Sequence, residues 1–421
     1  MSQAVAPVDV DISLPPLHPG QRAVAEHRTR FRIVVAGRRW GKTRLGAVLC
    51  FAEMLLGKRV WWLAPTYAQA TVAWRDLTRL ARVCDQQKFP IVIRLGDLLV
   101  QAPTGGWVQV RSADDPDRLR GEGLDFVVFD EAATIPENTW TEVIRPALAD
   151  RKGRALFIGT PRGRNWFWKL VQDAQRDPIQ WQVWQVPTVG HPLSNPFIDP
   201  NEIEAARRSL PERVFRQEFL AEFVEDGGGI FRNVRSQAIA QRQERPQPGH
   251  VYVIGVDWGK FEDFSVFLVL DATNRMVADV VRLRQIDYTT QMQQLIALAH
   301  HWRPLTIVAE RNAMGEPLVE QLLQRGLPVQ PVQVHAGVKH ALVDALALAL
   351  EQEQLLLPGW SEASWLIDEL EAFTAERLPS GLLRYTAPPG QHDDGVMALA
   401  LAWSAAAATP PPAYGPTIWG W

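Results

Sequence analysis

Residues 34–43 read Val34-Val35-Ala36-Gly37-Arg38-Arg39-Trp40-Gly41-Lys42-Thr43. An apolar, β-branched run from Phe31 precedes this stretch, and an apolar helical pattern follows it from Leu45 to Leu56. The order of strand, glycine-containing turn, Gly-Lys-Thr and helix is typical of a phosphate-binding loop, in which backbone N–H groups and a helix N-terminus face the anion. Ala36 stands where such a loop often has its first glycine, and its small side chain still allows the turn.

The side chains of this loop match the charges of a nucleoside triphosphate with its metal ion. Lys42 is expected to neutralise the β- and γ-phosphates, and the Thr43 hydroxyl to bind Mg²⁺. Gln21 precedes the first strand in His18-Pro19-Gly20-Gln21, and its amide has the donor and the acceptor needed to read an adenine edge. A surface glutamine in a turn would leave the same pattern. We predict ATP and Mg²⁺ as cofactors, with nucleotide contacts from Gln21, Gly37, Arg38, Gly41, Lys42, Thr43 and Asp130.

The second motif is the apolar strand 126–129, which ends in Asp130 and Glu131. In an enzyme with a phosphate loop, the Asp at such a strand end supports Mg²⁺, and an adjacent Glu polarises the attacking water. A strand followed by an acidic helix cap is the alternative, but the combination with a phosphate loop favours a nucleotide hydrolase. We therefore predict Asp130 as the metal support and Glu131 as the catalytic base.

Three further residues are candidates for catalysis at this site. Thr160 ends the next strand in Ile158-Gly159-Thr160-Pro161, where a hydroxyl can sense the γ-phosphate. An arginine beside the γ-phosphate stabilises the charge of the transition state, from the same subunit or from a neighbour. Arg39 inside the loop and Arg120 ahead of the acidic strand are the candidates for this role.

Composition and length describe a cytoplasmic protein of more than one domain. A chain of 421 residues is too long for one ordinary core. Its 22% charged and 47% hydrophobic content and net charge of −3 are typical of soluble globular proteins. Two cysteines, Cys50 and Cys84, cannot form a disulfide framework, which favours a reducing compartment. No apolar run has the length of a membrane span, and the N-terminus has no signal-peptide pattern.

The first half of the chain reads as an α/β domain. Apolar strands alternate with helical patterns between residues 31 and 186, which predicts a mainly parallel sheet with helices on both faces. We predict a flexible arm at residues 1–16, because this segment is proline-rich and aperiodic. A P-loop ATPase domain is expected at residues 17–225, with a small helical lid at about 190–225.

The second half reads as a separate domain of the ribonuclease H type. Glycines and prolines predict a linker at residues 226–250. Three closely spaced strands followed by alternating helices and strands predict a ribonuclease H-like sheet at residues 251–408. The proline-rich residues 409–421 are expected to form a disordered tail.

Acidic residues stand at three separate places in this second domain. Asp257 ends its first strand, Glu310 ends a later strand, and Asp393 and Asp394 stand at a helix start. Helix capping and surface charge explain each position taken singly. Together, carboxylates at these positions can hold two divalent ions, Mg²⁺ or Mn²⁺, about 4 Å apart, as in two-metal nucleases.

The order of these motifs resembles that of the large terminase subunit of tailed bacteriophages, over roughly residues 17–405. The resemblance rests on Ala-Gly-Arg-Arg-Trp-Gly-Lys-Thr, then Phe-Asp-Glu-Ala, Gly-Thr-Pro and the later acids. It implies that Arg39 is the loop arginine, that Arg120 is a finger offered to a neighbouring subunit, and that Thr160 couples hydrolysis to movement. It also assigns Asp257, Glu310, Asp394 and the adjacent Asp393 to the nuclease. Glu310 departs from the family pattern, in which Asp often stands there.

The resemblance implies a motor that pumps double-stranded DNA into a procapsid with the energy of ATP, and a nuclease that cuts concatemeric DNA. The implied partners are double-stranded DNA, the portal protein and a small terminase subunit. A homo-oligomeric ring on the portal is expected in the host cytoplasm, and not in the mature virion. Two alternatives remain open from the sequence: a helicase-like repair translocase with a nuclease module, and an inactive DNA-binding or structural module.

Overall fold

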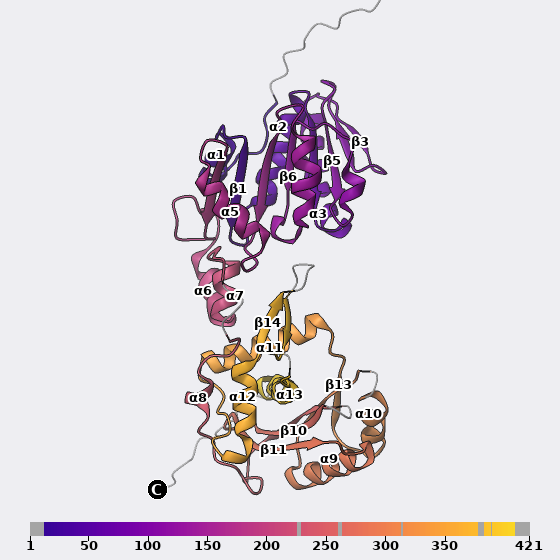
Figure 1. Cartoon of the computed structure of the whole chain (residues 1–421), viewed down its shortest axis with the longest axis vertical. Coiled ribbons are helices and arrows are strands. Elements are labelled where there is room, and N and C mark those ends of the chain that lie inside the picture. The colour runs from indigo at the N-terminus through magenta and orange to yellow at the C-terminus, as the bar shows by residue number, and fades with distance from the viewer. Residues whose placement is uncertain are drawn as a thin grey trace, which may run out of the picture. The chain divides into compact units, whose positions relative to one another are not determined.

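The computed structural model describes residues 12–224, 229–259, 263–312, 315–377, 383–388 and 390–408 (Figure 1). The chain divides into two compact units that separate near residue 226. Within the described residues, no helix is long and apolar enough to cross a membrane. The predicted tail and the glycines at 227 and 228 lie outside the described residues.

The first unit is built on an eight-stranded sheet with the order β3-β4-β5-β2-β6-β7-β1-β8. Its strands are β1 (Phe31–Ala36), β2 (Arg59–Ala64), β3 (Val92–Arg94), β4 (Leu99–Gln101), β5 (Trp107–Ser112), β6 (Phe126–Phe129), β7 (Arg154–Gly159) and β8 (Trp181–Val186). Neighbouring strands from β5 through β8 are parallel, whereas β3 and β4 form an antiparallel edge. The predicted parallel sheet is confirmed, and the short edge strand β3 was not predicted.

Helices cover both faces of this sheet, because successive side chains of a strand point to opposite sides. On β1, Val34 packs in the core that contains the buried residues of α2 (Lys42–Leu55) and α3 (Tyr67–Gln86). Its neighbours Ile33 and Val35 pack in the opposite core with α5 (Trp166–Arg176) and the π-helix η3 (Thr139–Ile144). The remaining helices of this unit are α1 (Pro19–Ala25), α4 (Arg145–Ala147), α6 (Pro200–Ser209) and α7 (Glu212–Glu218), of which the last two match the predicted helical lid.

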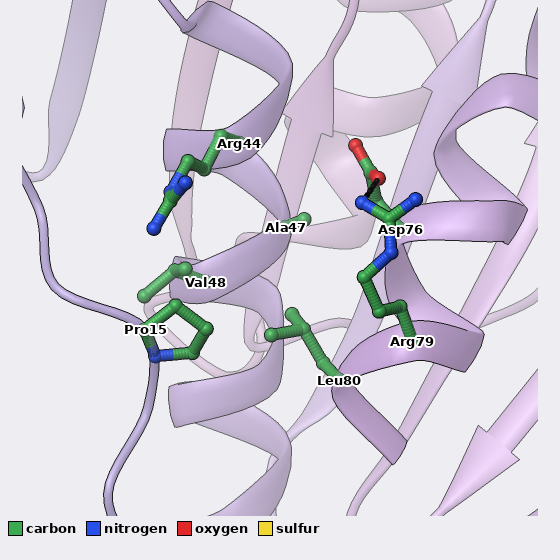
Figure 2. Close-up of a pocket in the computed structure, with 7 residues that line it drawn as sticks. All are labelled: Pro15, Arg44, Ala47, Val48, Asp76, Arg79 and Leu80. Atoms are coloured by element: carbon green, nitrogen blue, oxygen red, sulfur yellow. Dashed lines mark hydrogen bonds and ion pairs between the residues drawn. The ribbon is translucent and has the colours of Figure 1, made fainter. Parts of the chain in front are cut away.

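The segment at residues 12–16, predicted as part of a flexible arm, is docked onto this unit. Ser13 exchanges two backbone hydrogen bonds with the side chain of Gln87, at 2.9 and 3.1 Å. Arg44 of α2 donates to the carbonyl of Pro16 at 3.1 Å. Pro15 lies beside Val48 at a small cavity of about 150 Å³ between α2 and α3 (Figure 2). The arm prediction is therefore wrong for residues 12–16, and residues 1–11 lie outside the described residues.

The second unit has a five-stranded sheet in the order β11-β10-β9-β12-β13. Strands β9 (Tyr252–Asp257), β10 (Phe264–Asp271) and β11 (Met276–Arg284) are antiparallel, and β12 (Thr306–Glu310) and β13 (Val329–Val332) run parallel to β9. Buried residues of α11 (Ala336–Glu351), α12 (Ser364–Ala372) and α13 (Asp394–Ala408) form the core on one face. Those of α9 (Tyr288–Trp302) and α10 (Gly315–Gln324) form the core on the other. This is the predicted ribonuclease H-like order, to which a hairpin of β14 (Thr374–Arg377) and β15 (Leu383–Thr386) is added.

Most of the predicted linker is part of this second unit. Ile230, Phe231 and Val234 are buried in its core, and residues 234–237 form the short helix α8 (Val234–Gln237). The backbone N–H of Ala240 donates to Leu357 at 2.9 Å. The linker prediction is therefore wrong for the stretch from Ile230 to Ala240, because apolar residues between its polar ones bind it to the core.

Gly255 on β9 determines how closely α13 approaches the sheet. A Cβ at this position would lie 2.0 Å from the carbonyl oxygen of Ala398 and 2.6 Å from the nitrogen of Ala402, both backbone atoms of α13. We expect Gly255→Ala to lower the free energy of unfolding by about 1–3 kcal/mol, because the helix must shift to relieve the overlap. Urea unfolding of the full chain measures this change.

Gly337 near the start of α11 offers a matched control. A Cβ there would meet its nearest atoms, in the His335 ring, at 3.4 Å, which is ordinary contact. Gly337→Ala should leave stability unchanged or raise it slightly, because alanine restricts the unfolded chain more than glycine. Equal unfolding midpoints for Gly255→Ala and Gly337→Ala would contradict the close helix–sheet packing.

Candidate active sites

The phosphate loop and its partner motifs come together at one edge of the first sheet. Strand β7 lies between β1 and β6, and the three strands are parallel. The loop after β1, the acids after β6 and Thr160 after β7 therefore leave the sheet at the same edge. A cavity of about 430 Å³ lies there, within the range of small-molecule sites. It is lined by Arg38, Arg39, Gly41, Lys42, Thr43, Gln69, Glu131, Thr160, Arg162 and Glu218.

Lys42 joins the loop to the end of β7. Its ammonium donates to the carbonyls of Ala36 (2.6 Å) and Gly37 (3.2 Å) and to the hydroxyl of Thr160 (3.1 Å). Burial lowers the pKa of Lys42, whereas the nearby carboxylates of Glu131 and Asp130 raise it. A buried ammonium beside backbone N–H groups at a helix start fits a polyphosphate.

Backbone conformation in the loop depends on glycine. Gly41 has a φ of 97°, and a Cβ on it would lie 2.5 Å from Nε2 of Gln21. Gln21 is buried, and its amide nitrogen donates to the Gly41 carbonyl (2.9 Å) while its amide oxygen accepts from the N–H of His18 (3.1 Å). Adenine recognition by Gln21 stays a prediction, and it would require Gln21 to release one of these two partners.

The lid holds the two arginines of the loop in different ways. Glu218 on α7 accepts from Nε of Arg38 at 2.5 Å, and this ion pair raises the pKa of Arg38. The backbone N–H of Arg38 donates to the Glu218 carbonyl at 2.7 Å. Arg39 has a φ of 64°, and its carbonyl accepts from the side chain of Asn195 at 2.8 Å. Arg38 is thus engaged with the lid, whereas the side chain of Arg39 is exposed at the cavity.

The paired acids differ in their surroundings. Asp130 is buried, and burial, with the adjacent Glu131 as the next cause, raises its pKa to about 7. Glu131 lines the cavity with a φ of 47°, in the left-handed region that non-glycine residues rarely adopt. Its carbonyl accepts from both the N–H and the hydroxyl of Thr134 at 2.8 Å. Strain of this kind is concentrated at functional sites. The oxygens of Thr43 and Asp130 are of the type that Mg²⁺ prefers.

Arg120 does not line this cavity. Its side chain is 54% exposed and forms ion pairs with Asp117 (3.0 Å) and Glu142 (3.7 Å). Exposure leaves a role toward a neighbouring subunit as a prediction.

The acids of the second unit are brought together by strand register and by α13. Residue Val256 pairs with Ala309 in parallel, so that the next residues, Asp257 and Glu310, follow side by side. Helix α13 begins at Asp394 and packs its backbone on Gly255, two residues before Asp257. Residues two apart on a strand face the same side, which places Asp257 on the side of α13.

These carboxyl groups act on one another. Burial raises the pKa of Asp257 well above its ordinary range, with further contributions from Glu310, to which it is hydrogen-bonded, and from Asp394. Burial also raises the pKa of Asp394 to about 6, although its carboxylate accepts from the N–H of Phe264 at 3.2 Å. Asp393 instead forms an ion pair with Lys339 at 2.7 Å. Of the two adjacent acids, Asp394 is therefore the one that belongs to the cluster around Asp257.

The donor set fits hard divalent cations. In the part of the chain that the structure describes, no three His, Cys, Asp or Glu side chains form a finished set of metal ligands. Crowded carboxylates around the buried Asp257 nevertheless repel one another, and positive charge among them relieves that repulsion. Ligands that are all carboxylate oxygens suit Mg²⁺ or Mn²⁺ rather than a thiolate-bound metal.

Several side chains at the two sites were not predicted from the sequence. Gln69, Arg162 and Glu218 line the first cavity. Near the second cluster, Glu369 accepts from the N–H of Gly395 (3.0 Å) and from Arg282 (2.7 Å). Burial raises the pKa of Glu369 to about 7. Arg162 could have been found from its position two residues after Thr160, whereas Glu218 and Glu369 stand in helices far from the motifs in sequence.

His392 and Asp263 were also not predicted. Nδ1 of His392 lies 3.7 Å from Asp394 and 3.9 Å from Asp263. Its ring packs edge-on against Phe264, with the centroids 4.9 Å apart. Both residues therefore lie at the border of the carboxylate cluster.

Comparison with known proteins matches both units. Residues 33–238 match the family described as terminase large subunit, T4likevirus-type, N-terminal, and residues 254–406 match the terminase RNaseH-like domain. The terminase large subunit of Thermus phage G20c is 32% identical over 427 residues, which cover 92% of this chain and 87% of that protein. That of Escherichia phage T5 is 32% identical over 213 residues, or 50% of this chain and 47% of that protein.

A solved structure supports the same arrangement of folds. The large terminase of a second thermophilic bacteriophage is similar with a TM-score of 0.59 at 14% identity, covering 93% of this chain and 99% of that one. Its likeness concerns the fold alone, whereas the relative from phage G20c is similar in sequence over most of both chains. The chain belongs to the terminase large subunit family.

Proposed function

We propose that the first unit, residues 17–225, binds and hydrolyses ATP, and that the second, residues 251–408, cuts DNA with divalent metal ions. As a terminase large subunit, the chain is a DNA-packaging enzyme with an ATPase and a nuclease domain. The observation that carries the proposal is the pair of separate sites: an ammonium and a carboxylate at a phosphate loop, and a buried carboxylate cluster at a ribonuclease H-like sheet.

At the ATPase site each residue has a distinct task. Lys42 and the loop N–H groups bind the β- and γ-phosphates, and Thr43 and Asp130 would hold Mg²⁺, which neutralises phosphate charge. Glu131 accepts the proton of the attacking water on its carboxylate, while the bond between the γ-phosphorus and the bridging oxygen breaks to leave ADP. Thr160, bonded to Lys42, lies where the loss of the γ-phosphate is sensed.

Arginines complete the charge balance of this site. Arg39 is assigned to the same subunit's transition state, and Arg120 to that of a neighbouring subunit in a ring. The exposure of Arg120 and its absence from the cavity lining agree with use outside its own subunit.

At the nuclease site, Asp257, Glu310 and Asp394 would hold two Mg²⁺ or Mn²⁺ ions, which supply Lewis acidity and an activated water. Asp393 would support them from its ion pair with Lys339. The extra methylene of Glu310 relative to an aspartate lets its carboxylate reach Asp257, to which it is hydrogen-bonded.

The cellular setting follows from family membership by analogy. We propose that the chain translocates double-stranded DNA into a procapsid in the host cytoplasm and cuts concatemeric DNA. Its partners would be the portal protein and a small terminase subunit, with a homo-oligomeric ring on the portal that is absent from the mature virion.

Lys42→Ala tests the separation of the two activities. Removing the ammonium should lower ATP hydrolysis by about 100-fold or more, because one preorganised charge on the phosphates is lost. Cleavage of supercoiled plasmid with Mn²⁺ should remain, and EDTA should abolish it. Plasmid that stays intact with wild-type protein and Mn²⁺, or ATP hydrolysis that persists in Lys42→Ala, would contradict the assignment of the corresponding site.

A further inference from the structure

Arg162 lines the nucleotide cavity and has no role in the assignments above. It follows Gly159-Thr160-Pro161 at the end of β7 and shares the cavity with Lys42, Thr43 and Glu131. Its Nε atom is buried and has no hydrogen-bond partner within the described residues. Because buried donors in folded proteins are almost always paired, a buried guanidinium N–H without a partner at a phosphate-binding cavity points to an anionic ligand.

The other arginines of this region have different surroundings. Arg38 is paired with Glu218 of the lid, and Arg120 with Asp117 and Glu142 outside the cavity. Arg39 lies on the loop itself with an exposed side chain. Arg162 alone comes from β7, the strand between the phosphate loop and the paired acids.

The end of β7 is held close to both catalytic elements. Thr160, two residues before Arg162, accepts from the ammonium of Lys42 at 3.1 Å. A Cβ on Gly159 would meet the backbone nitrogen of Ala132 at 3.2 Å, which places the strand end against the residue that follows Glu131. A cation at position 162 therefore lies between the group that binds the phosphates and the group that activates water.

We propose that Arg162 contacts the terminal phosphate of bound ATP from within the same subunit and so distinguishes ATP from ADP. This inference rests on the proposed ATPase function of the cavity. A guanidinium donates two parallel hydrogen bonds to phosphate oxygens, and these are lost once the γ-phosphate has left.

The contact would also reach α5. Asn165 caps α5 and donates to the carbonyl of Ala133, and Trp166 donates to that of Ile135 at 2.7 Å. Only Gly163 and Arg164 separate Arg162 from this cap. Loss of the phosphate contact is therefore felt directly at the start of a helix that is bonded to the segment after the catalytic acids.

Equilibrium binding of ADP and of the slowly hydrolysed analogue ATPγS to the full chain tests the proposal. Arg162→Ala should weaken ATPγS by roughly 10- to 100-fold, the value of a charge-assisted contact, and change ADP affinity by less than about twofold. Arg162→Lys should recover part of the ATPγS affinity, because it keeps the charge without the planar pair of donors. A merely structural role would weaken both nucleotides together.

Arg164→Ala is the matched control. Arg164 is exposed, contacts the Trp168 ring at 5.3 Å and does not line the cavity. It should leave both affinities unchanged. Equal loss of ADP and ATPγS binding in Arg162→Ala, no loss in either, or the same loss in Arg164→Ala would overturn the inference. Wild-type protein that binds neither nucleotide would instead overturn the proposed ATPase function, and this inference with it.

Discussion

Replacing Glu131 with glutamine is expected to remove ATP hydrolysis and to leave nucleotide binding intact. Glutamine has nearly the shape of glutamate but cannot accept the proton of the attacking water, so turnover should fall by about 10²–10⁴-fold. ATPγS affinity should stay within about threefold of wild type, because the phosphates are bound by Lys42 and the loop N–H groups. Steady-state phosphate release and equilibrium binding on the same protein preparation measure the two effects.

The conformation of Glu131 makes this test specific. Its backbone is already in the left-handed region and is held by two hydrogen bonds from Thr134, neither of which involves the side-chain carboxylate. Glu131→Gln should therefore change the chemistry without moving the loop. Glu122→Gln, an exposed position outside the cavity lining, is the control and should turn over as wild type does. Wild-type turnover in Glu131→Gln would assign the base to another group.

The sequence was sufficient to predict the fold of both units and most of the residues at both sites. The phosphate loop, the acids after Phe129 and the carboxylate after Val256 are local patterns, and each stands at a strand end whose position depends on the strand's apolar run. The strand order that brings β7 between β1 and β6 is not local, but it follows from the fold class that the motifs indicate. Family membership disfavours the helicase-like and inactive-module alternatives.

What the sequence did not reveal depends on contacts between distant residues. Glu218 contacts Arg38 across 180 positions, and nothing around Glu218 distinguishes it from other acids in amphipathic helices. Glu369 caps α13 from a preceding helix, through a fold of the chain that periodicity does not specify. The docking of Ser13 on Gln87 was missed for a related reason, since a proline-rich segment without periodicity shows no partner in its own sequence.

The separation of Asp393 from Asp394 needed the structure as well. Adjacent residues at a helix start are equal in the sequence, and both can cap or bind metal. Lys339 on α11 pairs with Asp393, and the N–H of Phe264 on β10 binds Asp394. Two neighbouring elements thus turn two identical side chains to different tasks.

Asp257→Ala is expected to abolish DNA cleavage and to leave ATP hydrolysis unchanged. Asp257 is the most enclosed of the nuclease carboxyls and the one on which Glu310 and Asp394 both act, so it is placed to be shared between two cations. Its removal leaves ligands on two sides of the site without the carboxylate that joins them. Cutting of supercoiled plasmid with Mn²⁺ should fall below detection, while phosphate release by the same protein should match wild type, because the ATPase residues belong to the other unit.

Metal binding gives a second, independent measure of the same residue. A cation that binds only the folded protein stabilises it by mass action, so Mn²⁺ should raise the thermal midpoint of the wild-type chain without nucleotide, by an amount that grows with concentration. Asp257→Asn, which keeps the shape but loses the charge, should reduce this shift, and Asp368→Asn, at a side chain 72% exposed on α12, should preserve it. An Asp257→Asn protein with the full Mn²⁺ shift, together with plasmid cutting by Asp257→Ala, would place the nuclease metals elsewhere. Loss of both effects in Asp257 variants alone would assign the metals to the carboxylate cluster between β9, β12 and α13, as the repulsion among its buried acids predicts.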